Sequence, residues 1–418
     1  MARFRSLNVF RGALARFAHA SAPRPFLILG GTAWGLQNSY HEPEYKLKSP
    51  YQIIPRVKQM RQPELRRSFQ ESAVLDTDTR KSAGPCSDAP REIETTTGTI
   101  LRTTPVFDTY WRFAALRQDI FMRRLSRTKP PWSDDPILST YRFTNPYRAS
   151  DRVSQYLIRD VLYRGNRATD EVFFRALLFR LFNKIETWER LSSELGPLVW
   201  RDFDYRSYAQ VLDSAAASGQ KIYSSAYIIP SPAFGSPKKH RNHLRLLHAM
   251  MLDGAPDKVR SADSLSEVFN TIRSYPSFGS FLAFQLAIDL NYSEILDFSE
   301  NEFVVAGPGA RAGIRKCFSN VQDTTPEQVI QTVASIAKDE FERLGLTFKT
   351  LWGRELQLVD HQNLFCELDK YTRVAFPTLT GGSLRRRIKR KYRPNSAPLP
   401  QWYPPKWNLQ IPAKLPSD

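Results

Sequence analysis

The stretch RSYPSFGSFLAFQLAIDL, residues 273–290, places a proline and a glycine between two segments with the apolar spacing of helices. The second segment follows Gly279 and carries Gln285 and Asp289 among apolar residues. Apolar spacing of this kind predicts helices, and proline with glycine predicts a turn between them. We therefore expect two helices joined at residues 276–279, with two polar side chains buried in the second helix.

This turn has the features of a site that holds a nucleic-acid backbone. The start of a helix exposes unpaired amides, which bind a phosphate oxygen without reading a base. The helix-hairpin-helix pattern is matched at Tyr275, Pro276, Gly279 and Ala283, whereas Ser277 stands where the pattern has its first glycine. A left-handed backbone at Ser277 costs on the order of 1 kcal/mol. The alternative interpretation is an ordinary turn punctuated by proline and glycine.

Composition places the chain among proteins without a membrane span or a disulfide framework. It has 418 residues, of which 41% are hydrophobic, enough for one large core or two smaller ones. The apolar run at residues 25–36 is shorter than the roughly 20 residues that a span requires. The three cysteines lie far apart with no CxxC pair, so we predict a reducing compartment and neither disulfides nor a metal site.

The formal net charge of +18 is concentrated at the two ends. Residues 1–41 contain five arginines and no acid, and residues 371–418 contain ten Lys or Arg and one Asp. Basic arms of this kind favour attachment to a polyanion, so the expected partner is DNA, and no membrane partner is expected. We predict a nuclear protein; the alternative is a mitochondrial one, with residues 1–35 as a presequence. Oligomeric state is not predicted.

The folded part is predicted to be mainly α, with about ten helices between residues 106 and 375. Residues 170–191 are apolar on almost every face, which is typical of a central helix. Ser264 with Glu267, and Thr325 with Gln328, have the capping-box spacing of helix starts. We expect residues 1–104 to be a disordered or extended region, residues 105–375 the helical domain, and residues 376–418 a basic, proline-rich tail.

Residues 300–318 contain a second possible anion site. Here Gly307, Pro308 and Gly309 precede a predicted helix that carries Arg311. Glycine lets a ligand approach the backbone, and a helix start favours an anion. The alternative is a tight turn into a solvated basic helix. No GK[ST] loop and no GxGxxG motif occurs, so no small-molecule cofactor is assigned.

Two more groups of residues are candidates for binding or catalysis. Arg142, Arg148 and Arg152 are interleaved with aromatic residues, a mixture that suits phosphate contact and base stacking, although a loop held by Arg and Asp pairs fits equally well. Polar residues on helices with apolar faces must pair with each other or serve a ligand. These residues are Asn183, Lys184, Glu186, Gln285, Asp289, Glu367, Asp369 and Lys370.

Read in order, these motifs resemble the 5-hydroxymethyl-deoxyuridine DNA kinase helical domain, a domain type also named for alpha-glutamyl/putrescinyl thymine pyrophosphorylases. The resemblance covers about residues 106–375 and includes the segments WSDDPILSTYRFTNPYRASDRV, RALLFRLFNKIETWERL, YPSFGSFLAFQLAIDLNYS, EFVVAGPGARAGI and LFCELDKYTRV. Members are regarded as relatives of helix-hairpin-helix DNA glycosylases and are linked to hypermodified thymine bases. The resemblance implies an all-α fold in which the hairpin holds DNA and a flipped pyrimidine enters the helical cleft.

We expect a DNA base-modification enzyme, of transferase or pyrophosphorylase type, that acts on 5-hydroxymethylpyrimidine-derived bases. In this hypothesis Asp289 or Glu367 is the base, Lys184 or Lys370 balances charge, and Glu186 belongs to the same set. Loss of such a base should reduce turnover and leave stability near that of the parent. The expected DNA contacts are Pro276, Ser277, Gly279, Gly307, Pro308, Gly309, Arg311, Arg142, Arg148 and Arg152.

Two alternatives remain open. The first is a catalytically inert DNA-binding module, and the second is a glycosylase-like repair enzyme. Phe281 stands where a bifunctional glycosylase carries its lysine nucleophile, which argues against N-glycosidic cleavage by that mechanism.

Overall fold

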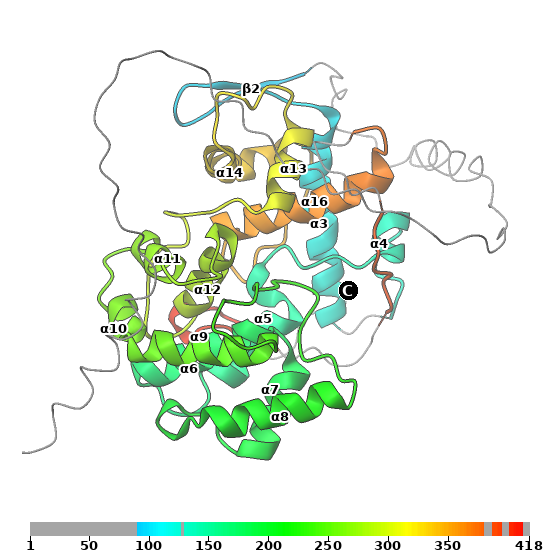
Figure 1. The fold of residues 1–418 in the computed structure, drawn as a ribbon. Helices are drawn as coiled ribbons and strands as arrows, with labels where there is room; N and C mark the ends of the chain where they lie inside the picture. Colours follow the sequence, from blue (N-terminus) through cyan, green and yellow to red (C-terminus); the bar gives the residue numbers. More distant parts are fainter. Residues whose placement is uncertain (1–89, 127–128, 380–386, 395–400, 413–418) are drawn as a thin grey trace, which may run out of the picture. The chain divides into compact units, whose positions relative to one another are not determined.

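The computed structural model describes residues 90–126, 129–379, 387–394 and 401–412, and these residues are mainly helical (Figure 1). The predicted presequence, residues 1–35, lies outside them. Among the described residues no helix is long and apolar enough to cross a membrane. The α-helices are α3 (Pro105–Leu125), α4 (Pro136–Thr140), α5 (Arg152–Tyr156), α6 (Thr169–Phe182), α7 (Ile185–Leu195), α8 (Tyr205–Ala217), α9 (Lys239–Leu252), α10 (Ala255–Arg260), α11 (Leu265–Arg273), α12 (Ser280–Asn291), α13 (Pro308–Cys317), α14 (Pro326–Ser335), α15 (Ala337–Arg343) and α16 (Leu358–Ala375).

Four short helices of other types complete the helical elements of these ranges. They are η1 (Arg148–Ser150), the π-helix η2 (Leu157–Leu162), η3 (Trp200–Asp202) and η4 (Pro405–Trp407). The predicted mainly α class is confirmed. The predicted helix starts at Ser264 and Thr325 are confirmed as well, since each side chain accepts a hydrogen bond from the backbone N–H three residues later.

A short β-hairpin precedes α3, within the region that we expected to be extended. Strands β1 (Glu92–Glu94) and β2 (Ile100–Arg102) are antiparallel, and Ile93 pairs with Leu101. Both of these side chains are buried. The chain then bridges Thr103 to Phe318. The ordered part therefore begins ahead of residue 105.

The predicted central helix at residues 170–191 is two helices. Helix α6 ends at Phe182, Asn183 adopts a left-handed conformation with φ of 49°, and α7 begins at Ile185. Asparagine tolerates this conformation better than most residues, so it ends the helix at little cost. Helix α6 is nonetheless buried on nearly all sides, as the sequence indicated, and two arginines, Arg175 and Arg180, are buried with it.

Helices α13 and α16 pack closely because glycines remove the side chains between them (Figure 1). A Cβ atom at Gly313 would collide with the backbone carbonyl of Phe365, and one at Gly309 would collide with the sulfur of Cys366. The collision at Gly313 cannot be relieved by a side-chain movement, because backbone atoms meet there. Packing alone therefore accounts for glycine at both positions.

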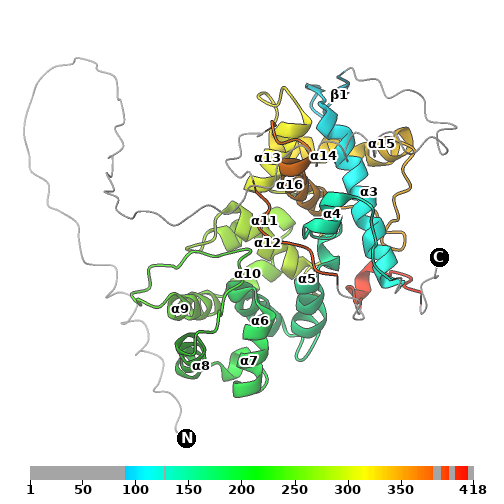
Figure 2. The same ribbon diagram turned by 90° about the vertical axis from the view of Figure 1, so that its right-hand side faces the viewer.

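Parts of the basic tail belong to the fold. Tyr141 bridges Lys391, and Trp402 packs edge-on against Tyr163 at a ring distance of 4.7 Å. Lys406 donates to the carbonyls of Asn291, Ser293 and Leu296 at the C-terminal end of α12. Figure 2 shows this segment in red beside α5. A cation suits the end of a helix, where carbonyls lack partners. Residues 387–394 and 401–412 therefore pack against the helical domain.

The docked tail predicts a loss of stability when Trp407 is replaced by alanine. The Trp407 ring lies 3.9 Å from the guanidinium of Arg354 and 5.5 Å from the ring of Tyr292. The free energy of unfolding should fall by about 2–3 kcal/mol in urea titrations. Lys389→Ala, at an exposed position of the same tail, is the control and should change it by less than about 0.5 kcal/mol. Equal stabilities for the two variants would contradict docking.

Candidate nucleic-acid interface and buried polar cluster

The predicted hairpin lies between α11 and α12. Ser277 adopts φ of 70°, the left-handed conformation that the sequence pattern indicated. Phe278 is buried beneath the turn, whereas Pro276 and Gly279 are exposed. Gly279 precedes α12, whose first turn receives no side-chain cap. The unpaired amides of that turn are therefore left for solvent or a ligand.

Neither conformation nor internal packing requires glycine at position 279. Its φ is −71°, which any residue adopts, and an added Cβ atom would meet no atom within 4 Å. The space beside Gly279, at the start of α12, is open among the described residues. A group as large as a phosphate can therefore approach these amides, and a side chain at position 279 would obstruct it.

The opposite end of α12 lies in the core, where it carries Asp289. Arg148 Nη2 lies 2.8 Å from Asp289 Oδ1, and Arg180 Nη2 lies 2.5 Å from Asp289 Oδ2. Arg148 Nε also donates to Gln285 Oε1 at 2.8 Å. We call these four residues the Asp289 cluster. Asp289 itself has no exposed surface.

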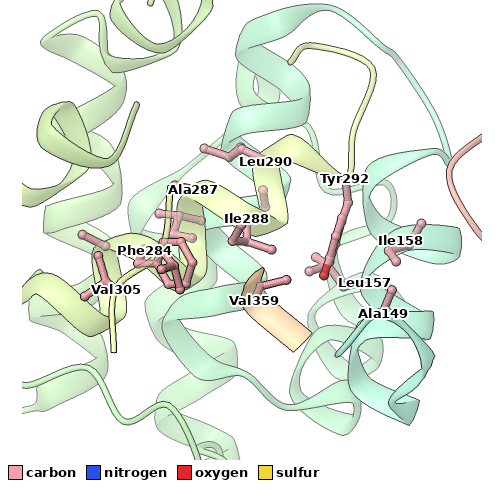
Figure 3. Close-up of a cluster of buried hydrophobic side chains, with 14 of the residues drawn as sticks. Ala149, Leu157, Ile158, Phe284, Ala287, Ile288, Leu290, Tyr292, Val305 and Val359 are labelled. Carbon is pink, nitrogen blue, oxygen red and sulfur yellow. The ribbon is translucent and has the colours of Figure 1, made fainter. Parts of the chain in front are cut away.

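Apolar residues surround this cluster and lower the local dielectric. Figure 3 shows Phe284, Ala287 and Ile288 of α12 packed with Val305 and Val359. Burial opposes the charge on Arg148, but the carboxylate of Asp289 together with the neighbouring Tyr292 and Tyr227 raises the pKa of this arginine above its ordinary value. Each charged member of the cluster therefore keeps its charge only because its partners of opposite charge are present.

This arrangement changes the expected roles of two residues. Both oxygens of Asp289 already accept hydrogen bonds from arginines and the side chain has no exposed surface, whereas a general base must be within reach of its substrate. Arg148 was expected at a DNA surface, but it is 2% exposed and serves the core. The structure therefore makes Asp289 the counter-ion of the cluster and places Arg148 out of reach of a DNA backbone.

Asp360 joins α16 to the same cluster. It accepts the backbone N–H of Arg148 at 2.7 Å and that of Gln357, the N-cap of α16, at 3.0 Å. Burial raises the pKa of Asp360 to about 6, and the two backbone donors oppose this shift. One carboxylate thus fixes both the start of α16 and the backbone that carries Arg148.

Tyr227 connects the cluster to the hairpin helix, a connection that the sequence analysis missed. Its ring lies 5.0 Å from the guanidinium carbon of Arg180 and stacks on Phe281 at 5.9 Å. Phe281 belongs to the first turn of α12, and a Cβ atom at Gly307 would lie 2.7 Å from its ring. Tyr227 also has an unusual φ of 53°. Residues with strained backbones gather at functional sites. This backbone angle, which the sequence does not show, is the local feature that marks Tyr227.

The Gly-Pro-Gly turn is held by its own neighbours. Arg311 donates to the carbonyl of Ala306 at 3.1 Å and to Glu327 at 3.2 Å. Gly307 faces Phe281, and Gly309 faces Cys366. Packing therefore explains both glycines. Anion binding by Gly307, Pro308, Gly309 and Arg311 stays a prediction.

The remaining predicted catalytic residues form two ion pairs at partly exposed positions. Lys370 Nζ lies 2.6 Å from Glu367 Oε2, which also accepts the backbone N–H of Thr144 at 3.0 Å. Lys184 Nζ lies 3.1 Å from Glu186 Oε2. Neither pair includes Asp289, so the five residues belong to three separate ion-pair groups. Asp369 is paired with Lys316 in the core instead.

Two predicted DNA contacts lie at the surface. The side chains of Arg142 and Arg152 are exposed, and Arg152 is 3.9 Å from Glu186, a weak interaction at this exposure. In the described ranges, no group of three or more His, Cys, Asp or Glu side chains could hold a metal ion.

Residues 104–381, more than half of the chain, match a family model described as "5-hmdU DNA kinase, helical domain". A Bacillus phage SP10 protein named "5-hmdU DNA kinase" is 28% identical over 286 residues, which cover 64% of this chain and 45% of the phage protein. The chain thus spans less than half the length of that relative. No solved structure matches it significantly.

The Asp289 cluster predicts a large loss of stability for Asp289→Asn. The amide keeps the shape of the side chain but leaves two buried arginines without a counter-ion, so unfolding should become easier by roughly 3–5 kcal/mol. Asp323→Asn, at an exposed position, is the control for removing one negative charge. Urea titration measures both variants. A stable Asp289→Asn variant would contradict the structural role and restore the original hypothesis of a catalytic base.

Asp360 predicts a pH dependence of stability. Because its pKa is raised in the folded chain, its contribution is complete below its ordinary pKa of 3.8 and declines as pH rises through about 6. The stability advantage of the parent over Asp360→Asn should therefore shrink by about 2 kcal/mol between pH 4 and 7. Denaturant titrations of both proteins across this range measure the difference. A difference that does not vary with pH would show that the carboxyl is not perturbed.

Proposed function

Because the chain belongs to the family of 5-hmdU DNA kinase helical domains, we propose that it acts in the enzymatic modification of 5-hydroxymethyluracil-type bases in DNA. The phage relative carries the name of such an enzyme. Since this chain covers 45% of that relative and has no GK[ST] loop, the proposal does not extend to the kinase reaction itself. It concerns DNA binding and the presentation of the base.

The observation that carries the proposal is the open space at Gly279. The hairpin supplies uncapped amides at the start of α12, and Ser277 adopts the strained conformation that orients the turn. These features together favour a phosphate contact that addresses the DNA backbone and not its sequence. The opposite end of α12 is anchored by Asp289 and Lys406, so the amides are held on a rigid element.

For the chemical step, Glu367 and Lys370 are the better placed of the predicted residues. Their side chains are 12% and 22% exposed, in contrast to Asp289. We propose that Glu367 serves as the base and that Lys370 balances its charge. The transferred group and any cofactor are not assigned.

A second candidate is the inert DNA-binding module. It is favoured by the complete engagement of Asp289, which leaves this carboxylate without a free oxygen. The two candidates share the hairpin and differ in turnover, so DNA affinity and modified-base content test them separately. Comparing nucleosides from DNA treated with the parent or with Glu367→Gln, by mass spectrometry, distinguishes them: identical nucleosides favour the inert module.

The hairpin predicts that Gly279→Val weakens DNA binding without unfolding the chain. A branched side chain in the open space obstructs a phosphate, so affinity for a short duplex should fall about tenfold or more in fluorescence anisotropy, while thermal stability stays near that of the parent. Parent binding should weaken steeply with salt, as counterion release requires.

Ser277→Gly is the matched control in the same turn. It relieves the left-handed strain at φ of 70° and should keep DNA affinity intact, with stability raised by about 1 kcal/mol. If a folded Gly279→Val protein binds DNA as tightly as the parent, the hairpin is not the phosphate site. Failure of the parent itself to bind DNA would remove the proposed function.

A further inference from the structure

An aromatic pocket lies between α3, α4 and the docked tail. Its volume is about 310 Å³. Four rings line it, from Trp132, Tyr141, Phe143 and Tyr392, together with Arg117. Three prolines complete much of the remaining wall. We call it the aromatic pocket.

Contacts from α16 and from the tail hold the walls in place. Lys370 Nζ lies 4.4 Å from the centre of the Phe143 ring. Tyr371 donates to Asp135 at 2.6 Å, and Asp135 caps the start of α4. On the tail side, the backbone N–H of Tyr392 donates to the carbonyl of Thr140 at 2.8 Å. The pocket is therefore preformed and lies next to the Glu367–Lys370 pair.

Arg117 brings hydrogen-bond donors to this wall. Its Nη2 donates to Asn145 at 2.6 Å, but its buried Nη1 has no hydrogen-bond partner among the described residues. Burial lowers the pKa of this arginine from its ordinary value, with Asp151 opposing the shift. A buried donor without a partner costs free energy. A ligand that accepts a hydrogen bond from Nη1, once the Arg117 side chain has moved toward it, removes that cost.

The rim of the pocket is basic. Arg142, Arg390, Lys391 and Arg393 are exposed on the two segments that pair beside it. A ligand with an aromatic ring and a polyanionic backbone matches this combination of aromatic walls and basic rim.

We infer that the aromatic pocket receives one pyrimidine base that has been extruded from DNA. The inference rests on the proposed function, because it takes DNA as the ligand. Extruded bases stack between aromatic and apolar side chains, and a uracil ring presents carbonyl acceptors to a donor such as Arg117. The basic residues of the rim contact the flanking phosphates. The tail thus gains a function as one wall of a base site.

Photochemical cross-linking locates the base directly. The full chain is bound to a duplex with a single 5-iodouracil, whose iodine occupies the position of the hydroxymethyl group, and is irradiated. Mass spectrometry should place the adduct on Trp132, Tyr141, Phe143 or Tyr392. An adduct elsewhere, such as on Tyr227 or Phe281, with DNA bound, would overturn the pocket and leave the proposed function standing. No binding of the duplex in anisotropy would end both proposals.

Affinity measurements provide the second test. The parent should bind a duplex with a single mispaired 5-hydroxymethyluracil more tightly than the same duplex with an abasic site. Tyr392→Ala should reduce the ratio of the two affinities about tenfold, which is the effect expected from the loss of one stacking ring. Its affinity for the abasic duplex should equal that of the parent. Tyr392→Phe keeps the ring and should restore the ratio, while the exposed control Lys389→Ala should not alter it. A ratio that is unchanged in Tyr392→Ala would contradict the inference.

Discussion

The ion pairs of Asp289 with Arg148 and Arg180 are the interaction on which the structure depends. They join three parts of the chain that are distant in sequence, namely η1, α6 and α12. Buried charges of this kind contribute little net stability, but the loss of any one partner is severe because the others remain without compensation. The cluster therefore specifies how α12 is oriented, and the hairpin inherits that orientation.

From this cluster, contacts continue outward to both proposed DNA sites. Arg180 lies against Tyr227, Tyr227 stacks on Phe281, and Phe281 covers Gly307. Arg148 is bound through its backbone to Asp360 at the start of α16, the helix that also carries Glu367 and Lys370. The core thus connects the proposed phosphate-binding turn with the aromatic pocket through α6, α12 and α16, and Tyr227, which lies in the segment between α8 and α9, is one link in this path.

Local patterns in the sequence were sufficient for the hairpin and the helix starts. Ser264 and Thr325 accept hydrogen bonds from backbone groups three residues away, and Ser277 adopts the left-handed conformation at its own position, so local spacing carries the information. The sequence revealed only part of the Asp289 cluster. Asp289 and Gln285 stand out because they interrupt an apolar helix, but the partner Arg180 lies 109 residues away from Asp289. No local spacing encodes such a contact. Arg148 was assigned to a DNA contact because it is interleaved with aromatic residues, whereas the structure pairs it with Asp289 in the core.

The sequence gives only weak local signals for three other features of the structure. Each strand of the β-hairpin buries one central residue, which is too few to produce a visible alternation. The tail has the proline and basic content of a disordered segment, and only its aromatic residues, Trp402, Tyr403 and Trp407, indicated docking. At Asn183 the apolar pattern of the sequence continues, but the left-handed backbone ends the helix. The pattern alone therefore does not reveal this break.

The contact between Lys406 and the end of α12 has a consequence for biosynthesis. The carbonyls that Lys406 binds are translated some 110 to 115 residues before it. At a typical synthesis rate of about 5–20 residues per second, several seconds pass before the lysine emerges from the ribosome. During that interval water must satisfy these carbonyls, and the surface that Trp407 later covers remains open. The contacts at the end of the hairpin helix are thus completed late in translation, and until then this surface of the nascent chain is accessible to chaperones and to aggregation.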